Sequence, residues 1–144
     1  MHADAVPLAS GGAAAIVFDG RARVLLVKEN YDRRRFSLPG GALEDGETPE
    51  DAVVRETREE TGVEVAVDHL VGRYTLDNGF TAYAFRCTIL AGVPSVQNVE
   101  EIAWVGWHPS DDLPTPRSNI LHYAVPDALA GHRGVVRTDL PRVS

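Results

Sequence analysis

Three glutamates between residues 40 and 63 have types and spacing that could do chemistry. Glu56, Glu59 and Glu60 lie within the stretch GGALEDGETPEDAVVRETREETGV. On an α-helix, residues three and four positions apart share a face, so these carboxylates would fall within an arc of about 100°. Like charges at this spacing repel one another, and a bound divalent cation would reverse the sign of that interaction. The spacing therefore indicates a site for a hard cation such as Mg²⁺, which prefers carboxylate oxygens.

The neighbouring residues predict where this helix begins and ends. Thr48 can cap the free N–H groups, the proline after it suits the first helical position, and the next two acids favour the positive end of the helix dipole. Gly62 is a natural left-handed terminator. We therefore expect a helix over roughly 49–61. On its surface Arg55 and Arg58 fall opposite the glutamates, so we expect them to face outward.

The less specific interpretation is a solvated helix face, which is the usual role of a glutamate-rich segment. The wider stretch favours function, because it matches the pattern G-x5-E-x7-R-E-U-x-E-E-x-G-U, where U is a bulky aliphatic residue. The matching residues are Gly41, Glu47, Arg55, Glu56, Glu59, Glu60, Gly62 and Val63. At average residue usage, seven fully specified positions match by chance with odds on the order of 10⁻⁸ per start site.

This stretch resembles the conserved box of the Nudix (MutT-like) hydrolase family. The segments FSLPGG (36–41) and EEIAWVGWHPSDDLP (100–114) are similar to those that flank the box in this family. One position departs from the pattern, since Thr57 stands where an aliphatic residue is more usual. The resemblance implies an α/β (α+β) fold, a three-layer α/β/α sandwich with a central mixed sheet. In such a fold the box forms a catalytic loop–helix–loop.

The resemblance also implies an activity and a set of residue roles. Such enzymes hydrolyse the pyrophosphate of a nucleoside diphosphate linked to another moiety, with Mg²⁺ or, as a substitute, Mn²⁺. Carried over by position, the metal ligands would be Glu56, Glu59, Glu60 and the backbone carbonyl of Gly40. Arg55 and Glu47 would orient the glutamates through a salt link.

A carboxylate near the metal could take the proton of the attacking water. Glu101 matches a later glutamate that serves some members of the family as a ligand or base. The general base stays open among Glu56, Glu59 and Glu101. Glu100 lies beside Glu101 and is the alternative for the inward-facing residue.

Candidate substrate contacts lie on both sides of the box. Arg33, Arg34 and Arg35 could clamp distal phosphates, because guanidinium groups match phosphate oxygens, although an exposed charged loop explains them equally well. Phe80 and Tyr83 could stack on a base, and the alternative is that they belong to the core. We favour a nucleoside triphosphate or modified nucleotide as substrate. A dinucleoside polyphosphate, a nucleotide sugar or ADP-ribose, and a nucleotide-sensing module without catalysis are the alternatives.

Composition limits the remaining classes of function. The 144 residues suffice for a single domain over 1–144, with 1–11 as a flexible or loosely packed segment. A formal charge of −7 argues against long nucleic acid and anionic membranes as partners. The lone Cys87, the lack of a secretory signal and the lack of a long apolar run fit a cytoplasmic protein. The family resemblance makes a homodimer plausible.

The remaining pattern predicts the elements that position the box. Strands are expected at 13–19 and 23–29, which a tight turn would join, at 63–76 and 80–90, which would form a hairpin, and at 102–108. Residues 118–132 have helical content, but Pro126 should break or kink the helix. The tail from 133 to 144 carries no clear pattern.

Overall fold

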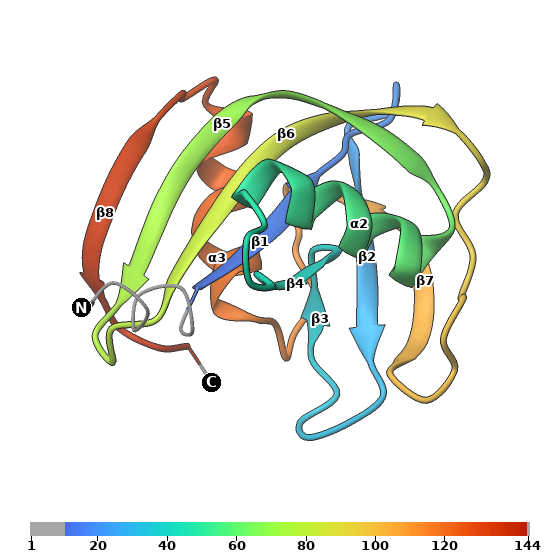
Figure 1. The fold of residues 1–144 in the computed structure, drawn as a ribbon, viewed down its shortest axis with the longest axis horizontal. Coiled ribbons are helices and arrows are strands. Elements are labelled where there is room, and N and C mark those ends of the chain that lie inside the picture. Colours follow the sequence, from blue (N-terminus) through green and yellow to red (C-terminus); the bar gives the residue numbers. More distant parts are fainter. Residues whose placement is uncertain (1–10, 144) are drawn as a thin grey trace.

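The computed structural model describes residues 11–143. Its elements in chain order are β1 (Gly11–Ile16), β2 (Arg23–Glu29), β3 (Phe36–Ser37), β4 (Gly40–Ala42), α2 (Pro49–Thr61), β5 (Glu64–Leu76), β6 (Thr81–Ala91), β7 (Ile102–Pro109), α3 (Asn119–Leu129) and β8 (Val135–Leu140) (Figure 1). The expected flexible segment over 1–11 falls outside the described residues except for Gly11. That glycine belongs to β1, because it pairs with Thr81 of β6.

Two sheets form the scaffold of the molecule. The larger has five strands in the order β4-β1-β6-β5-β8, and the smaller has three in the order β3-β2-β7. Strands β1 and β6 are parallel, as are β5 and β8, whereas the other pairs are antiparallel. The central sheet is therefore mixed, as expected from the sequence.

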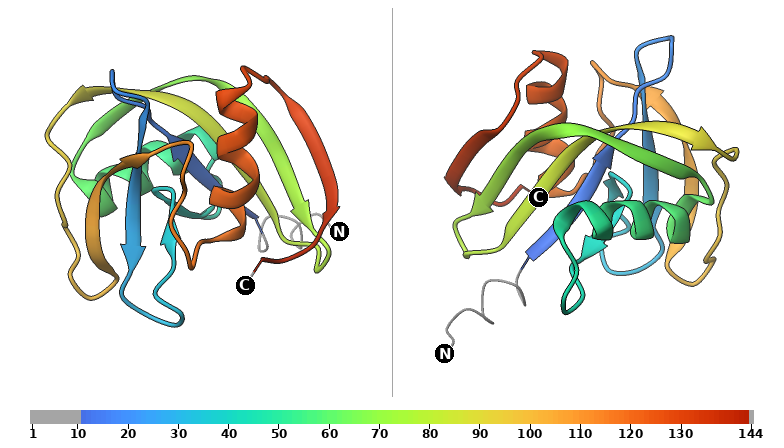
Figure 2. Two further views of the ribbon diagram at one scale, coloured as in Figure 1. Left: turned by 180° about the vertical axis from the view of Figure 1, so that it is seen from behind. Right: turned by 45° about the horizontal axis from the view of Figure 1, so that its top comes forward.

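The helices α2 and α3, the two within residues 11–143, cover opposite faces of this scaffold. Figure 1 has α2 in front of the sheet, and the view from behind in Figure 2 has α3 in front. Side chains of β1 alternate between the two resulting cores, since Ala15 packs with Val53 of α2 and Ile16 with Leu121 of α3. This arrangement confirms the three-layer α/β/α sandwich.

The strand predictions are confirmed in position, with one difference in pairing. Strands β5 and β6 form the expected antiparallel hairpin, and β7 covers the segment predicted at 102–108. The segments predicted at 13–19 and 23–29 also form strands, but β1 and β2 diverge into different sheets. Only the ends near the turn pair, through the Phe18–Val24 bridge.

Helix α2 has the predicted ends. The side chain of Thr48 accepts a hydrogen bond from the backbone N–H of Asp51 at 3.1 Å. Gly62 terminates the helix with a φ of 79°, and its N–H donates to the carbonyl of Arg58. Local capping chemistry therefore determines the length of this element.

Of the two effects expected of Pro126, a break or a kink, the break does not occur, because α3 continues through it to Leu129. Proline removes one backbone donor, but Leu121, Ala124 and Val125 bury the helix against the sheet and keep it intact. None of the helices within residues 11–143 is long and apolar enough to cross a membrane.

The tail contains a strand that the sequence pattern did not predict. Strand β8 pairs in parallel with β5, so that Val135 lies opposite Gly72. Most of its side chains are exposed, and a short edge strand of this kind lacks the apolar alternation that identifies strands in a sequence. Beyond it the chain runs to Val143 past the turn that joins β5 to β6 (Figure 1).

Candidate active site

The glutamates of α2 face the loop that contains Gly40 and Gly41. The backbone N–H of Gly40 donates to Glu60 Oε1 at 3.0 Å. A Cβ atom on Gly41 would lie 2.6 Å from Cδ of Glu56, and one on Gly40 would lie 2.2 Å from the carbonyl oxygen of Ala13. Both glycines are therefore required for the close approach of loop and helix.

Arg55 links the carboxylates of the box. Its Nε and Nη2 donate to the two carboxylate oxygens of Glu47 at 2.6 and 3.0 Å. Its Nη1 donates to Glu56 at 2.9 Å and to Glu59 at 3.1 Å, and Nη2 reaches the carbonyl of Ala42 at 3.3 Å. The expectation that Arg55 faces outward is therefore wrong. Its long side chain bends back along the helix, because five acceptor oxygens from four residues lie there.

The pKa values of two glutamates that bind Arg55 shift in opposite directions. Hydrogen bonds from the Arg55 guanidinium and from the backbone N–H of Glu44, which donates to Glu47 Oε1 at 2.9 Å, lower the pKa of Glu47 to about 2. Burial raises the pKa of Glu56, Arg55 opposes this effect, and the charges of Glu59 and Glu101 reinforce it. Glu47 is thus ionised at neutral pH and anchors the arginine. Burial and neighbouring negative charges, in contrast, disfavour the ionised form of Glu56.

Glu60 is the most perturbed acid of the cluster. Burial raises its pKa to about 8, the N–H of Gly40 opposes the rise, and the charges of Glu56, Glu101 and Glu29 add to it. A carboxylate in this environment needs a nearby cation to be ionised at neutral pH. Its surroundings are therefore suited to binding a cation.

Three residues from outside α2 complete the acidic cluster. The charge of Glu101 acts on both Glu56 and Glu60, and Asn30 N–H donates to the Glu101 carbonyl at 2.8 Å. Pattern reasoning missed the other two, Glu29 and Tyr31. Burial and the charges of Glu29, Glu60 and Glu101 raise the pKa of Tyr31. Glu29 is buried in the structure. Its position at the end of the apolar strand RVLLVKE was the signal in the sequence that could have identified it.

The carboxylates of the box are chemically suited to binding a hard divalent cation. Within residues 11–143, no three acidic, imidazole or thiol side chains converge as a ready-made metal cluster. The reason is visible in the contacts, since Arg55 holds Glu56 and Glu59 while Gly40 holds Glu60. Burial and neighbouring charges raise the pKa of Glu56 and of Glu60. A divalent cation would stabilise their ionised forms, and carboxylate oxygens are the ligands that it prefers.

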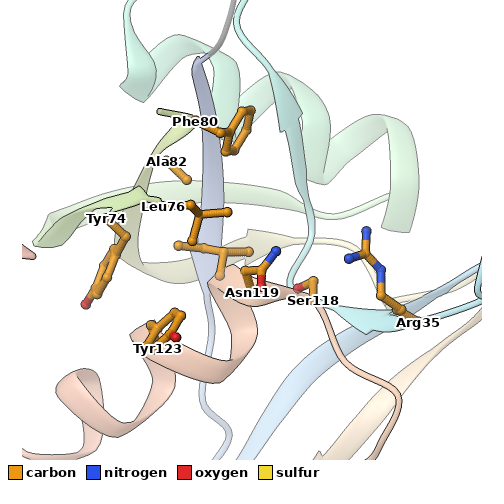
Figure 3. Close-up of a pocket in the computed structure, with 9 residues that line it drawn as sticks. Arg35, Tyr74, Leu76, Phe80, Ala82, Ser118, Asn119 and Tyr123 are labelled. Atoms are coloured by element: carbon orange, nitrogen blue, oxygen red, sulfur yellow. The ribbon is translucent and has the colours of Figure 1, made fainter. Parts of the chain in front are cut away.

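Two hollows open beside this loop. One, of about 210 Å³, is lined in part by Gly40, Gly41, Glu29 and Tyr31. The second, which we call the aromatic hollow, has a volume of about 130 Å³ and is drawn in Figure 3. It is lined by Arg35, Tyr74, Leu76, Phe80, Ala82, Ser118, Asn119, Ile120 and Tyr123. The hollows share Phe80, Ala82 and Ile120, so they are neighbours, and the second lies on the side towards α3.

Some of the candidate substrate residues line the hollows, and others lie away from them. Phe80 lines both hollows, whereas Tyr83 packs against the apolar core beneath α2, apart from Phe80. Arg35 lines the aromatic hollow and its Nε donates to Glu29 at 3.3 Å. Arg33 and Arg35 also line a polar basin beyond Asn119, while Arg34 lies in a turn with a φ of 53° and borders none of these spaces.

The comparisons with known proteins agree with this geometry. The sequence model of the NUDIX domain matches residues 10–128. A MutT-like protein of Streptomyces ambofaciens is 36% identical over 138 residues, which cover 95% of this chain and 88% of that protein. A Mycobacterium tuberculosis relative, named as a candidate 8-oxo-dGTP diphosphatase, is 37% identical over 97 residues, covering 62% of this chain and 69% of that protein. An ADP-ribose pyrophosphatase structure from Streptococcus suis has a TM-score of 0.72 at 27% identity, with 91% and 99% coverage.

The chain therefore belongs to the Nudix family. It is a Nudix hydrolase, a pyrophosphohydrolase with MutT-like relatives, and members of this family act on nucleotide-type substrates with divalent metal ions. The family and the enzyme class expected from the sequence are thereby confirmed.

Proposed function

We propose that this protein hydrolyses the pyrophosphate bond of a nucleoside triphosphate or modified nucleotide in the presence of Mg²⁺, for which Mn²⁺ can substitute. One observation carries the proposal. The crowded carboxylates of α2 lie at Gly40 and Gly41, and the hollow that these glycines line adjoins the aromatic hollow, with which it shares Phe80. Reactive phosphates at the loop and a nucleoside in the hollows would thus lie side by side.

Glu56, Glu59, Glu60 and the carbonyl of Gly40 would hold the metal. When bound, it neutralises phosphate charge and lowers the pKa of water. Arg55 and Glu47 would act as positioning residues, since their bidentate link directs Glu56 and Glu59 from outside the cluster.

The chain itself supplies groups for moving the proton of the attacking water. Glu56, Glu59 and Glu101 are the candidates for the general base, as carboxylates of one cluster. The side chain of Glu101 is exposed, and its charge acts on both Glu56 and Glu60, which supports a role beside the metal ligands. Phe80 would contact the nucleoside, and Arg33 and Arg35 would contact distal anionic groups. The original proposals for Arg34 and Tyr83 gain no support from their positions.

The names of similar proteins support a nucleotide substrate of either of two kinds. The MutT-like and 8-oxo-dGTP diphosphatase relatives favour triphosphates, while the ADP-ribose pyrophosphatase structure favours ADP-ribose as the alternative. We give preference to the triphosphate class, because the MutT-like relative matches this chain at higher identity and over nearly its whole length.

The test is hydrolysis across a panel of substrates with Mg²⁺, Mn²⁺ or a chelator. The panel contains unmodified and oxidised nucleoside triphosphates, ADP-ribose, nucleotide sugars and dinucleoside polyphosphates, and products are identified by mass. Metal-dependent release of a nucleoside monophosphate and pyrophosphate from a triphosphate is the expected result. Cleavage of ADP-ribose alone would correct the substrate class. Nucleotide binding without turnover would replace the proposal with a sensing module.

We further propose that residues 1–144 form a single domain, that the protein acts in the cytoplasm and that it binds no long nucleic acid. The acidic charge of −7 supports the last point. The expected homodimer stays a prediction, which light scattering of the full chain can check.

A further inference from the structure

Another hollow lies beside α3, on a different face of this helix from the aromatic hollow. We call it the Arg117 hollow. It has a volume of about 410 Å³, and its lining includes Asp111, Leu113, Arg117, His122, Pro126 and Leu129. None of these residues lines the aromatic hollow, to which the same helix contributes Asn119, Ile120 and Tyr123. At 100° per residue the two sets of helix positions face directions roughly 100° apart, so the two hollows are separate.

Arg117 brings a positive charge without a counterion to this hollow. Its Nε donates a hydrogen bond to Nδ1 of His122 at 3.1 Å, and its Nη1 donates to the carbonyl of Leu113 at 3.0 Å. Within residues 11–143 the guanidinium forms no ion pair with a carboxylate, and Nη2 donates to none of these residues. A half-buried arginine is normally paired with an acid, so this one favours an anion from solution.

His122 adds a second N–H group. A guanidinium only donates hydrogen bonds, so Nδ1 of His122 accepts, and the proton of the neutral ring is on Nε2. Burial and the charge of Arg117 lower the pKa of His122, which favours the neutral ring. The hollow is therefore lined by two residues that each keep an N–H donor for a ligand.

The backbone around Arg117 is fixed by strand β3. The N–H of Phe36 donates to the carbonyl of Pro116 at 2.8 Å, and the N–H of Ser118 donates to the carbonyl of Phe36 at 2.8 Å. With its backbone held on both sides and its side chain held by two acceptors, Arg117 loses little further freedom when a ligand binds.

The two donors suit a phosphate group. Guanidinium and imidazole N–H groups form charge-assisted hydrogen bonds with oxyanions, and a tetrahedral phosphate offers several oxygens to such donors at once. Asp111 is exposed and lies in the lining of the same hollow, so its negative charge opposes the binding of an anion.

We propose that the Arg117 hollow is a binding site for a phosphate-type oxyanion, either free phosphate or the phosphate group of an ester. Arg117 and His122 bind it, and Asp111 limits its affinity. The site lies outside both the carboxylates of α2 and the surface proposed for the substrate, and it does not depend on the proposed function.

The test is a titration of the full chain with inorganic phosphate at constant pH, followed through the imidazole signals of His122 in nuclear magnetic resonance spectra. The His122→Gln variant identifies these signals. They should shift until the site is saturated, and the pKa of His122 should rise, because a bound anion stabilises the imidazolium form. An equal shift with chloride at the same ionic strength would be a screening effect and would overturn the proposal.

Variants test the two charges of the hollow. Arg117→Gln removes the guanidinium and should weaken phosphate binding at least about 10-fold. Arg133→Gln is the matched control, because it removes a positive charge at an exposed position beyond α3 and should leave the response of His122 unchanged. Unchanged affinity in a folded Arg117→Gln protein would overturn the proposal.

Asp111→Asn gives a second test that leaves the contacts of Arg117 intact. It removes the opposing charge and should tighten phosphate binding about 2- to 5-fold. If Arg117→Gln does not fold, unchanged affinity in Asp111→Asn overturns the proposal instead.

Two further measurements separate the possible ligands and the two proposals. Methyl phosphate is titrated in parallel with inorganic phosphate, and the tighter of the two shows whether an ester or the free anion is preferred. The Glu60→Gln protein should bind phosphate at this hollow as the wild type does. A missing response of His122 would therefore overturn this inference alone, and missing hydrolysis in the substrate panel would overturn only the proposed function.

Discussion

At the scale of single residues, the site is a balance between negative charge and one arginine. Four carboxylates, from residues 47, 56, 59 and 60, lie on or beside α2, and Arg55 contacts three of them directly. The fourth, Glu60, relies on a backbone N–H, and burial raises its pKa to about 8. A group held in so costly a state is a candidate for function rather than for stability.

The corresponding prediction is that Glu60→Gln lowers kcat/KM by at least about 100-fold, because it removes a charge that would bind the metal. The glutamine oxygen can still accept the N–H of Gly40, so the fold should persist. Steady-state kinetics with Mg²⁺ and the circular dichroism spectrum measure the two effects. Glu50→Gln is the matched control, since this residue lies exposed in the first turn of the helix and should leave turnover nearly unchanged. Normal turnover in a folded Glu60→Gln protein would contradict the site assignment.

At the scale of elements, the position of the glutamates depends on where α2 stops. Gly62 has a φ of 79°, in the left-handed region that only glycine adopts without strain. The turn that follows leads directly into the long strand β5, so this residue couples the catalytic helix to the sheet.

We expect Gly62→Ala to lower the free energy of unfolding by about 1–2 kcal/mol through backbone strain. An added Cβ would also lie 2.7 Å from the end of the Gln97 side chain, which is flexible enough to move aside. Urea denaturation measures the change. Gly20→Ala serves as the control, because an added Cβ there meets nothing within 4 Å and the backbone needs no positive φ. Equal stability of the two variants would show that the left-handed turn is not strained by alanine.

At the scale of the whole molecule, Asp127 joins α3 to β5 and β8. It accepts hydrogen bonds from the Tyr74 hydroxyl at 2.8 Å and from Arg137 at 2.6 and 2.8 Å, and His132 Nδ1 lies 2.9 Å away. The Arg137 guanidinium holds the pKa of Asp127 well below its usual range, against the effect of burial, with further lowering by His132 and Tyr74. This network anchors the edge strand that precedes the tail.

The lowered pKa predicts how stability depends on pH. A carboxyl whose pKa is lower in the folded state stabilises the protein above its unfolded pKa of about 3.9 and loses that contribution as pH falls. Asp127→Asn should therefore cost about 1–3 kcal/mol at pH 7, and the difference from the wild type should shrink below pH 4 or so. Urea denaturation at pH 7 and at lower pH tests this, with the exposed Asp111→Asn as the control. A difference independent of pH would contradict the assignment.

The sequence by itself determined the local features of this protein. The capped helix 49–61, the shared face of its glutamates and the hairpin of β5 and β6 follow from interactions between residues a few positions apart. Even the separation of Phe80 from Tyr83 was within reach, because alternate positions along a strand face opposite sides.

Only the tertiary structure decided which distant segments meet at the site. It turned Arg55 back to the carboxylates, brought Glu29, Tyr31 and Glu101 to them, and placed the unpredicted tail against Asn119. It also kept α3 intact through a proline, since burial on the sheet outweighs one lost hydrogen bond. Such contacts depend on the packing of a mixed sheet between two helices, and local patterns of charge and hydropathy do not contain that information.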